Sequence, residues 1–464
     1  MTHAPAFRRR SAGKGSPARP IQPPDPVRLA AVEAYLEFDR GGALRDVPPE
    51  GLPSPVDRRL YSQLLLGMVR HKRYLEAEVT RLSHRGARRP QRAVAALAML
   101  GLFQLRFLSA VPAHAAVFET VQIAPRLGYG RAKGWVNGVL RTAQRELDSG
   151  AADPGTLPLA VRTSHPDWMV ERWRERYGEE ACRAICEANN RFAGTTVRCE
   201  GPDAEGAAAR LSAEGIAAEP HPRVRSALVV EQTGALLRST TFRDGAVYVQ
   251  DAASQLLTAW VAPLLEGWAI DGCAAPGGKL TQLVREATGT ARLVGIDRHL
   301  ERIGMIRENF DRLRQTPTPL LVADAERLPL QPGSPGTILL DVPCMSTGMI
   351  RKYPELKWRK RPSDIAAYAE AQRAMLAEAA RLLKPGGCIL YSTCSLEPEE
   401  NEGQIAAFLE VHRGFQRVSF GGLAPPAVLA GQAEAQITER GDFQTLPGAD
   451  WMGLYGAILR KRAE

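Results

Sequence analysis

The second half of the sequence alternates between short apolar runs and longer amphipathic stretches. From about Val247 onward, WAIDGC, RLVGID, TPLLVAD, GTILLDVPC and GGCILYSTC have the composition of buried strands. The stretches between them, among them GGKLTQLVREAT and HLERIGMIRENFDRL, have the apolar spacing of helices. Strands that alternate with helices predict a parallel, doubly wound sheet with ligands at the carboxyl ends of its strands. We therefore expect a Rossmann-like α/β domain over residues 246–464.

The first half of the chain has a different pattern. Residues 27–148 contain several stretches with apolar residues at helical spacing, including QRAVAALAMLGLFQLRFL, and these predict an all-α domain. SGAADPGTLP (149–158) has the composition of a linker. Residues 160–245 combine the helical DWMVERWRERYGEEACRAICEANN with the short strands GTTVRCE and SALVVE, which predicts a small α+β domain. The sequence thus predicts a multidomain protein with three folded parts.

Positive charge is concentrated near the N-terminus. The chain has a net charge of +9, of which residues 1–26 contribute +4. Residues 27–150 contain 19 basic and 11 acidic residues and contribute +8, so the remainder is slightly negative. A basic segment of this kind indicates a polyanionic partner, most commonly nucleic acid, although a solvated basic surface would give the same count. Residues 1–26 are predicted to form a disordered basic tail.

The cysteines and the hydropathy pattern restrict the class of protein further. The seven cysteines are odd in number and lie in a long chain, so we expect no disulfide framework. No Cys or His spacing suits a structural metal, so we expect no metal site. No apolar run reaches the roughly 18 residues that a membrane span needs, and residues 1–26 lack a secretory signal. We expect a cytoplasmic protein without a membrane partner.

A glycine-rich turn and several strand-end acids predict a cofactor pocket. AIDGCAAPGGKLTQL (269–283) is a strand, a turn and a helix without the G-x-G-x-x-G spacing of dinucleotide-binding folds. Asp297 closes the next strand, 20 residues after Gly277, which suits a carboxylate that holds ribose hydroxyls. Asp324 ends a third strand and could accept a hydrogen bond from an adenine amine. A nucleoside without a phosphate cradle fits S-adenosylmethionine better than NAD; the alternative is that each Asp caps a helix.

Two cysteines follow neighbouring strands. Asp341, Pro343 and Cys344 end the fourth strand, and Cys394 ends the fifth. Adjacent strands would bring both thiols to one rim of the sheet. The alternative is that both are packing cysteines, an interpretation that suits Cys388, in the middle of its strand.

A thiol beside a methyl donor has a specific chemical use. Carbon 5 of a pyrimidine is a weak nucleophile, and addition of a thiolate to carbon 6 turns it into an enamine-like centre that can accept a methyl group. Asp341 is placed to stabilise the adduct at N3 and the exocyclic amine of cytosine. A base must then remove the carbon-5 proton so that the thiol can leave. The glutamates after Cys394, in SLEPEENE, are expected to start a helix rather than to touch the thiol.

Several motifs resemble the RNA cytosine-5 methyltransferase family. These are QDAASQLL (250–257), DGCAAPGGKLTQL, LLDVPCMSTGMIRKYPELKW and YSTCSLEPEENE. In the first part of the chain, VPAHAAVFETVQIA and WVNGVLR resemble a NusB-type domain, and SHPDWMVERWRERYG (164–178) resembles the middle segment that accompanies it. The resemblance covers nearly all of residues 27–464.

The resemblance implies a substrate and a set of roles. The expected reaction is methyl transfer from S-adenosylmethionine to carbon 5 of a cytosine in RNA, here small-subunit ribosomal RNA, with no DNA partner. Cys394 matches the nucleophile of the family, Cys344 matches the second cysteine used in product release, and Asp341 belongs to the same catalytic group. The cofactor-binding positions are Cys273, Ala274, Ala275, Pro276, Gly277, Gly278, Lys279, Asp297, Asp324 and Asp341.

The sequence departs from the family pattern in two places. Met345 stands where the family usually has Ser, and residues 190–200 lack the usual proline-rich step. Three other functions compete with the expected one. The chain could modify another RNA (transfer RNA or large-subunit ribosomal RNA), or be a non-catalytic RNA-binding or ribosome-assembly factor. An amino-group methyltransferase would favour an Asp/Asn-Pro-Pro-aromatic turn, and the DVPC sequence here argues against that function.

Overall fold

The computed structural model describes residues 25–52, 54–83, 90–151, 157–192, 194–201, 204–287, 291–430 and 436–463. Nearly all of the predicted tail (1–26) and half of the predicted linker (149–158) lie outside the described residues. The chain divides into two compact units. The first comprises residues 1–68 and 75–153, and the second comprises residues 69–74 and 154–464.

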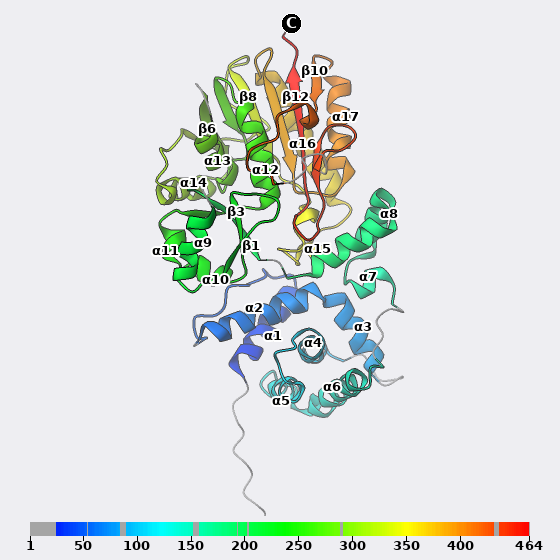
Figure 1. Cartoon of the computed structure of the whole chain (residues 1–464). Coiled ribbons are helices and arrows are strands. Elements are labelled where there is room, and N and C mark those ends of the chain that lie inside the picture. Colours follow the sequence, from blue (N-terminus) through cyan, green and yellow to red (C-terminus); the bar gives the residue numbers. More distant parts are fainter. Residues whose placement is uncertain are drawn as a thin grey trace, which may run out of the picture. The chain divides into compact units, whose positions relative to one another are not determined.

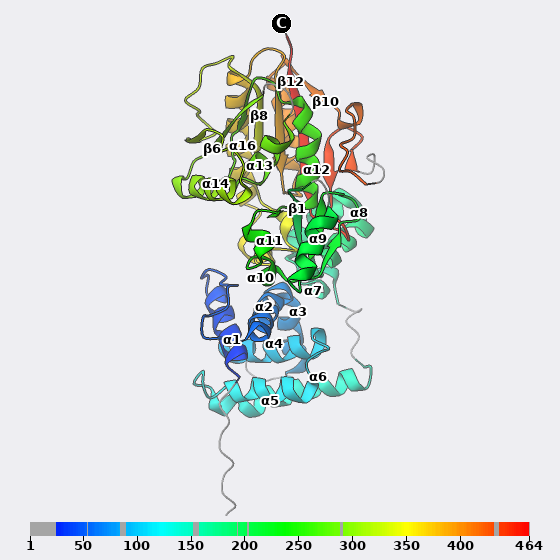
Figure 2. The same cartoon turned by 60° about the vertical axis from the view of Figure 1, so that its left-hand side comes forward.

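The first unit is helical, as predicted. Helix α4 is its core: the side chains of Leu97 and Leu100 are fully buried, and α1, α5 and α6 pack around it. Two glycines allow close helix packing, because a Cβ at Gly101 would lie 2.5 Å from Leu140 of α6 and one at Gly67 of α2 would overlap Phe103 of α4. Helices α5 and α6 lie side by side (Figure 2). The elements are α1 (Pro26–Asp39), α2 (Pro55–Arg70), α3 (Lys72–Leu82), α4 (Arg92–Phe107), α5 (Ala113–Ile123), the 3₁₀ turn η1 (Gly130–Ala132) and α6 (Lys133–Asp148).

The second unit begins with two helices and a small antiparallel sheet, which agrees with the expected α+β composition. The sheet has the strand order β2-β3-β1-β4. Helix α8 is kinked at Gly178, whose φ of +81° lies in the left-handed region that favours glycine. The elements are α7 (Leu159–Arg162), α8 (Asp167–Asn190), β1 (Thr195–Cys199), α9 (Ala204–Ala213), β2 (Ala218–Pro220), β3 (Ala227–Val230), α10 (Thr233–Leu236), α11 (Thr240–Arg243) and β4 (Val247–Val249).

The larger sheet of the second unit has the strand order β10-β12-β9-β8-β5-β6-β7 (Figure 1). Strands β5 to β9 are parallel and match the five predicted strands. The expectation of a wholly parallel sheet is wrong at one edge, because β12 pairs antiparallel with both β9 and β10. The strands are β5 (Trp268–Asp271), β6 (Arg292–Asp297), β7 (Leu320–Val322), β8 (Pro335–Asp341), β9 (Cys388–Thr393), β10 (Phe415–Val418), β11 (Phe443–Thr445) and β12 (Leu454–Lys461).

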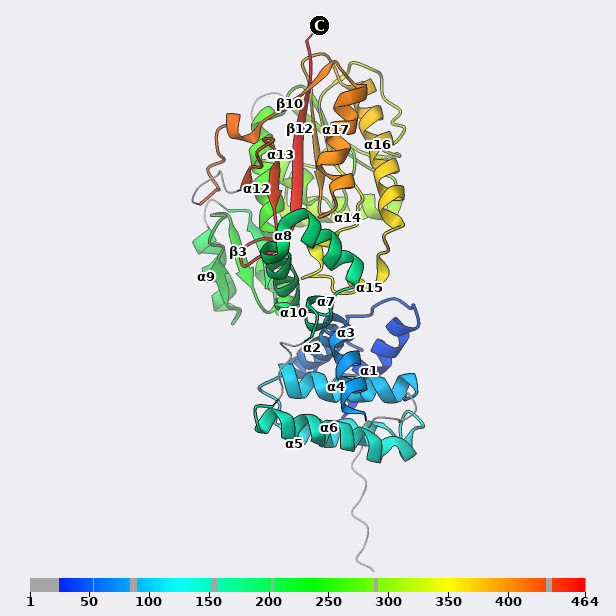
Figure 3. The same cartoon turned by 90° about the vertical axis from the view of Figure 1, so that its right-hand side faces the viewer.

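Helices cover both faces of this sheet (Figure 3). On one face, α12, α13 and α14 bury Leu256, Leu280 and Ile303 in one core, and on the other α16 and α17 bury Leu376 and Ile405 in a second core. None of the helices that the structure describes is long and apolar enough to cross a membrane. The helices and 3₁₀ turns are α12 (Ala252–Val261), η3 (Ala262–Leu264), α13 (Gly278–Glu286), α14 (Leu300–Leu313), η4 (Thr347–Met349), α15 (Leu356–Arg359), α16 (Asp364–Leu382), η5 (Pro398–Glu400), α17 (Glu402–Val411) and η6 (Phe420–Gly422).

Candidate active site

The two cysteines predicted at strand ends lie in contact. Strands β8 and β9 are parallel neighbours, with Asp341 opposite Ser392, so the segments that leave these strands emerge at the same edge of the sheet. The Sγ atoms of Cys344 and Cys394 are 3.4 Å apart. The strand pattern therefore predicted their proximity correctly, and Cys388 is buried within β9 as expected.

The two thiols differ in exposure and in acidity. Cys344 is buried and Cys394 is only partly buried. The hydrogen bond that Cys344 donates lowers the pKa of Cys394, and Ser346 contributes in the same direction against the effect of burial. The same bond, together with burial, raises the pKa of Cys344. Cys394 is therefore the thiol that ionises more readily and that a ligand can reach, which are the properties of a nucleophile.

An ion pair lies beside the thiols. The Nζ atom of Lys279, in the first turn of α13, is 2.7 Å from the Oδ2 atom of Asp341. The hydroxyl of Ser392 donates to the other carboxylate oxygen at 2.7 Å. Burial disfavours the charged form of Lys279, but Asp341, together with Asp271 and Cys394, outweighs this effect and raises the pKa of the lysine. At Cys394 the ammonium lowers the pKa of the thiol, while the carboxylate of Asp341 raises it more strongly.

Four strands of the sheet end in, or just before, a carboxylate. Asp271 ends β5, Asp297 ends β6, Asp341 ends β8, and Asp324 follows β7. Asp271 is 1% exposed, and burial followed by the negative charge of Asp341 raises its pKa from 3.8 to about 7. Asp271 is not among the predicted site residues, although it ends its strand as Asp297 and Asp341 do. Its place at the end of a buried strand is the sequence signal that predicts it.

The strand-end acids do not cap helices. Asp297 accepts a hydrogen bond from the backbone N–H of His299, and Asp324 accepts one from Glu326, both at 3.0 Å and both two residues along the chain. These contacts are Asx turns. The residue that caps α14 is His299, and no α-helix starts directly after Asp324. The alternative interpretation of these acids as helix caps is therefore wrong.

The glycine-rich turn joins β5 to α13. Gly277 has a φ of +105° and caps the helix, so its position requires glycine. A Cβ at Gly278 would lie 3.2 Å from the ring of Tyr248, and one at Gly272 would lie 3.0 Å from Leu340. Close packing against Tyr248 and Leu340 is therefore enough to explain why Gly278 and Gly272 lack a side chain, and no ligand is needed.

The glutamates after Cys394 have more than one role. Glu399 and Glu400 lie in the 3₁₀ turn η5, which starts at Pro398, and Glu402 lies in the first turn of α17, so the expectation of a helix start holds for these three glutamates. Glu400 is buried, and its carboxylate accepts hydrogen bonds from the backbone N–H of Met345 at 3.0 Å and from Gln372 at 2.9 Å. No hydrogen bond of the described residues joins a glutamate to Cys394. Glu400 instead anchors the segment that contains Cys344.

Glu397 and Glu399 join the segment that follows Cys394 to α8. Glu397 is buried and accepts from Arg172 at 2.7 Å, while Glu399 pairs with the same guanidinium at 2.6 Å. Arg176 pairs with Glu402 at 2.6 Å. The acidic segment after Cys394 is thus held to α8 by ion pairs.

Met345 replaces a residue that is usually polar, and its side chain is fully buried. A large apolar side chain therefore suits this position, while its backbone N–H is held by Glu400.

Among the residues described, no group of His, Cys, Asp and Glu could hold a metal ion, so the strand-end acids do not form a metal site.

Comparisons with known proteins agree with this geometry. Residues 258–459 match the family model "16S rRNA methyltransferase RsmB/F", residues 26–145 match "NusB family", and residues 165–236 match "Methyltr_RsmF/B-like, ferredoxin-like domain". Ribosomal RNA small subunit methyltransferase B of Vibrio cholerae is 37% identical over 445 residues, which cover 94% of this chain and 98% of that protein. The protein of the same name from Salmonella arizonae is 34% identical and covers 91% and 95%.

The chain belongs to the ribosomal RNA small subunit methyltransferase B family. The resemblance noted in the sequence is therefore confirmed, and the fold class, with NusB, ferredoxin-like and methyltransferase parts, is confirmed with it. Solved structures support the fold alone. The crystal structure of PH0851 has a TM-score of 0.73 at 22% identity and covers 94% of this chain and 99% of that one. NSun6 from Pyrococcus horikoshii with SFG has a TM-score of 0.54 at 19% identity and covers 64% and 98%.

Proposed function

We propose that this member of the ribosomal RNA small subunit methyltransferase B family transfers a methyl group from S-adenosylmethionine to carbon 5 of a cytosine in 16S ribosomal RNA. The observation that supports this reaction best is the pair of thiols 3.4 Å apart beside Asp341 and Lys279. A methyltransferase that acts on an amine or a hydroxyl needs no thiol. A cytosine carbon needs one to become nucleophilic and another group to end the covalent stage.

The strand-end residues suit S-adenosylmethionine. Asp341 and Asp297 are close enough to Asp271 for each to raise its pKa, and the cation of Lys279 lowers it. A site with more negative than positive charge favours a ligand with a cationic sulfonium and ammonium. We assign Asp297 to the ribose hydroxyls and Asp324 to the adenine amine. The turn Cys273, Ala274, Ala275, Pro276, Gly277, Gly278, Lys279 and the carboxylate of Asp341 complete the binding positions. When bound, this cofactor supplies an electrophilic methyl group.

Cys394 starts the reaction. Its thiol loses a proton to solvent, and the thiolate forms a bond to carbon 6 of the cytosine. The electron pair of the double bond between carbons 5 and 6 shifts toward N3, which takes up a proton. Asp341 is the group that we assign to hold N3 and the exocyclic amine, since its side chain is 35% exposed and is fixed by Lys279 and Ser392. Carbon 5 then has the electron density needed to accept a methyl group.

Cys344 ends the reaction. Its pKa is raised mainly by the hydrogen bond and negative charge that it shares with Cys394, together with burial. Once Cys394 is bonded to carbon 6, it holds no thiolate charge, so the influence that keeps Cys344 protonated weakens. The Cys344 thiol can then lose its own proton to solvent, and the resulting thiolate removes the proton from carbon 5. The electron pair restores the double bond between carbons 5 and 6, and the bond from carbon 6 to Cys394 breaks.

The remaining parts of the chain serve substrate binding in this proposal. We assign residues 27–148, whose charge is strongly positive, to RNA binding as a NusB-like domain, residues 160–245 to the small α+β domain and residues 246–464 to the methyltransferase domain. Ribosomal RNA is a cytoplasmic substrate, so we propose the cytoplasm as the place of action.

Methylation of purified RNA tests the function. The full chain is incubated with S-adenosylmethionine and unmodified 16S ribosomal RNA, large-subunit ribosomal RNA or transfer RNA, and each product is sequenced after bisulfite treatment. We expect one protected cytosine in 16S RNA and none with Cys394→Ala. Protection only in another RNA would refute the substrate, and methylation that survives Cys394→Ala would refute the mechanism. Tight 16S RNA binding without any methylation would favour a ribosome-assembly factor.

A further inference from the structure

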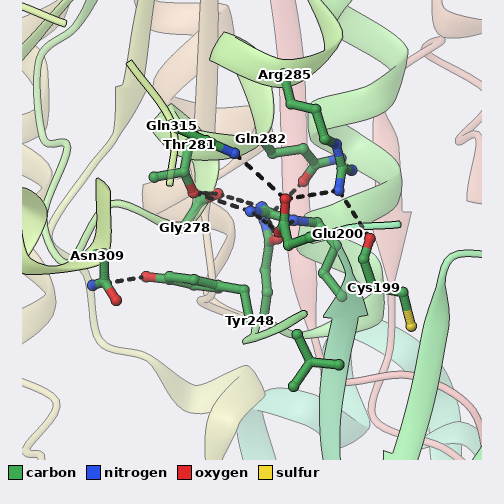
Figure 4. Close-up of polar contacts among 12 residues, drawn as sticks. Cys199, Glu200, Tyr248, Gly278, Thr281, Gln282, Arg285, Asn309 and Gln315 are labelled. Atoms are coloured by element: carbon green, nitrogen blue, oxygen red, sulfur yellow. Dashed lines mark hydrogen bonds and ion pairs between the residues drawn. The ribbon is translucent and has the colours of Figure 1, made fainter. Parts of the chain in front are cut away.

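A fully buried arginine of the small sheet contacts the cofactor turn. Arg198 lies in β1 and is 0% exposed. A guanidinium in the interior is costly unless its donors are satisfied, so a buried arginine needs a set of matched acceptors. Its neighbours come from three separate parts of the chain, and Figure 4 shows Glu200, Gly278 and Thr281 gathered in one network with Arg285.

The guanidinium has partners on all three of its nitrogens. The Nε atom donates to a carboxylate oxygen of Glu200 at 2.7 Å, and the Nη2 atom lies 2.6 Å from the same oxygen in an ion pair. The Nη1 atom donates to the side-chain oxygen of Gln250 at 2.6 Å and to the backbone carbonyl of Gly278 at 2.7 Å. The Nη2 atom donates to the hydroxyl of Thr281 at 3.0 Å. A planar guanidinium has five donors, and four of them make hydrogen bonds here.

Tyr248 supplies a second attachment to the same turn. It lies directly opposite Arg198 in the pairing of β1 with β4, and the guanidinium carbon of Arg198 is 5.1 Å from its ring centroid. The hydroxyl of Tyr248 donates to the carbonyl of Pro276 at 3.3 Å, and Asn309 of α14 donates to that carbonyl at 3.0 Å. Asn309 also contacts the hydroxyl of Tyr248 (Figure 4). The small sheet therefore contacts two carbonyl groups of the turn, those of Pro276 and Gly278.

The turn needs such outside support. Gly277 and Gly278 have no side chains with which to fix their own backbone, and glycine has the widest conformational freedom of all residues. The carbonyl of Gly278 and the hydroxyl of Thr281 lie in the first turn of α13, which also contains Lys279. A shift of this turn would therefore displace both the backbone assigned to the cofactor and the ammonium that pairs with Asp341.

We infer that Arg198 is a positioning residue for the cofactor turn, and that the small sheet thereby sets the affinity for S-adenosylmethionine. The inference rests on the proposed function, since it concerns the cofactor of that reaction. Arg198 is too deeply buried to reach substrate itself. Its planar guanidinium bonds to Gly278 and Thr281 on the turn side and to Glu200 and Gln250 on the other side. A lysine at this position would keep the positive charge but could not make these hydrogen bonds at the same time.

Binding and kinetics of Arg198→Lys test the inference in the full chain. Calorimetry should show S-adenosylmethionine bound about tenfold more weakly than by the wild type, because charged hydrogen bonds to the turn are lost. The KM for the cofactor should rise by a similar factor. At saturating cofactor and RNA, kcat should fall by a smaller factor than the KM rises, because the thiols keep their own contacts and Asp341 keeps its hydrogen bond from Ser392 when Lys279 moves with the turn. Unchanged affinity, or a fall in kcat with an unchanged KM, would overturn the inference.

Four further variants separate positioning from general stability. Thr281→Val removes the acceptor on the turn side and should also weaken binding, while the double variant with Arg198→Lys should lose less than the product of the two single effects. If Arg198→Lys does not fold, Thr281→Val decides the question. Val230→Ala lowers stability in the core of the same sheet without touching the turn, and Arg210→Gln changes an exposed arginine of α9. Both should bind the cofactor normally.

The outcomes distinguish the inference from the proposed function. A wild-type chain that binds no S-adenosylmethionine would overturn both. A wild type that binds normally, with Val230→Ala weakening binding as much as Arg198→Lys does, would overturn only the inference, because general loss of stability would then explain the effect.

Discussion

Asp271→Asn should stabilise the cofactor-free protein, and by more at high pH than at low pH. Asp271 is fully buried at the end of β5, and its pKa in the folded chain is about 7 against an ordinary value of 3.8. Because the folded state binds the proton more tightly than the unfolded state, the contribution of Asp271 to stability falls as pH rises from about 4 to about 7. An asparagine has a similar shape, stays neutral and can still accept from the backbone N–H of Cys273 as Asp271 does at 3.3 Å.

The magnitude follows from the two pKa values. With 3.8 in the unfolded chain and about 7 in the folded chain, ionisation of Asp271 costs about 2 kcal/mol at pH 5 and about 4 kcal/mol at pH 8. The stability advantage of Asp271→Asn should therefore grow by roughly 2–3 kcal/mol between these pH values. Lys279 already opposes part of the negative charge at this site, and its effect is included in the shift.

Urea unfolding of both proteins without cofactor, at half-unit steps from pH 5 to pH 8, measures this difference directly. Asp244→Asn is the matched control, because it makes the same substitution at a carboxylate that is 42% exposed. An advantage of Asp271→Asn that is independent of pH, or that shrinks as pH rises, would refute the assignment of a proton to this buried carboxyl.

Three other predictions address the cofactor, the thiol segment and the RNA surface. Asp297→Ala should weaken S-adenosylmethionine binding by about tenfold or more in calorimetry, because a charged hydrogen bond to the ribose is lost. Glu400→Ala leaves the backbone N–H of Met345 without its acceptor, so urea unfolding should show a loss of about 1–3 kcal/mol. Changing Arg141 and Arg145, both exposed on α6, to glutamine should reduce the slope of log RNA affinity against log salt by about 1.5, and an unchanged slope would place RNA binding elsewhere.

Most of what the sequence could predict about the site comes from one rule, that ligands bind at the carboxyl ends of the strands of a parallel sheet. Residues that follow adjacent parallel strands must meet at one edge, so the contact between Cys344 and Cys394 follows from strand order alone. The same rule did not reveal β12, because that strand returns from the far end of the chain to pair antiparallel with β9, and its sequence has no flanking helix to mark it.

Other features had no local signal. Arg198 is a charged residue within a strand, and three of its partners, Gln250, Gly278 and Thr281, lie 52 to 83 residues away, so only the folded structure reveals a satisfied guanidinium. Glu400 was expected to start a helix, and it lies in the 3₁₀ turn η5, but nothing in its local sequence predicted that it would be buried. Its burial depends on acceptor contacts with Met345 and Gln372, which reach it from other elements.

Trapping of a covalent RNA adduct tests the central claim, that two thiols divide the reaction between attack and release. Cys344→Ala is incubated with 16S ribosomal RNA and S-adenosylmethionine and analysed on a denaturing gel. The account predicts a protein–RNA band that persists under denaturing conditions and disappears when Cys394→Ala is added to the same chain. Normal turnover by Cys344→Ala without any trapped band would contradict the assignment of release to this residue, and a band that survives Cys394→Ala would contradict the nucleophile.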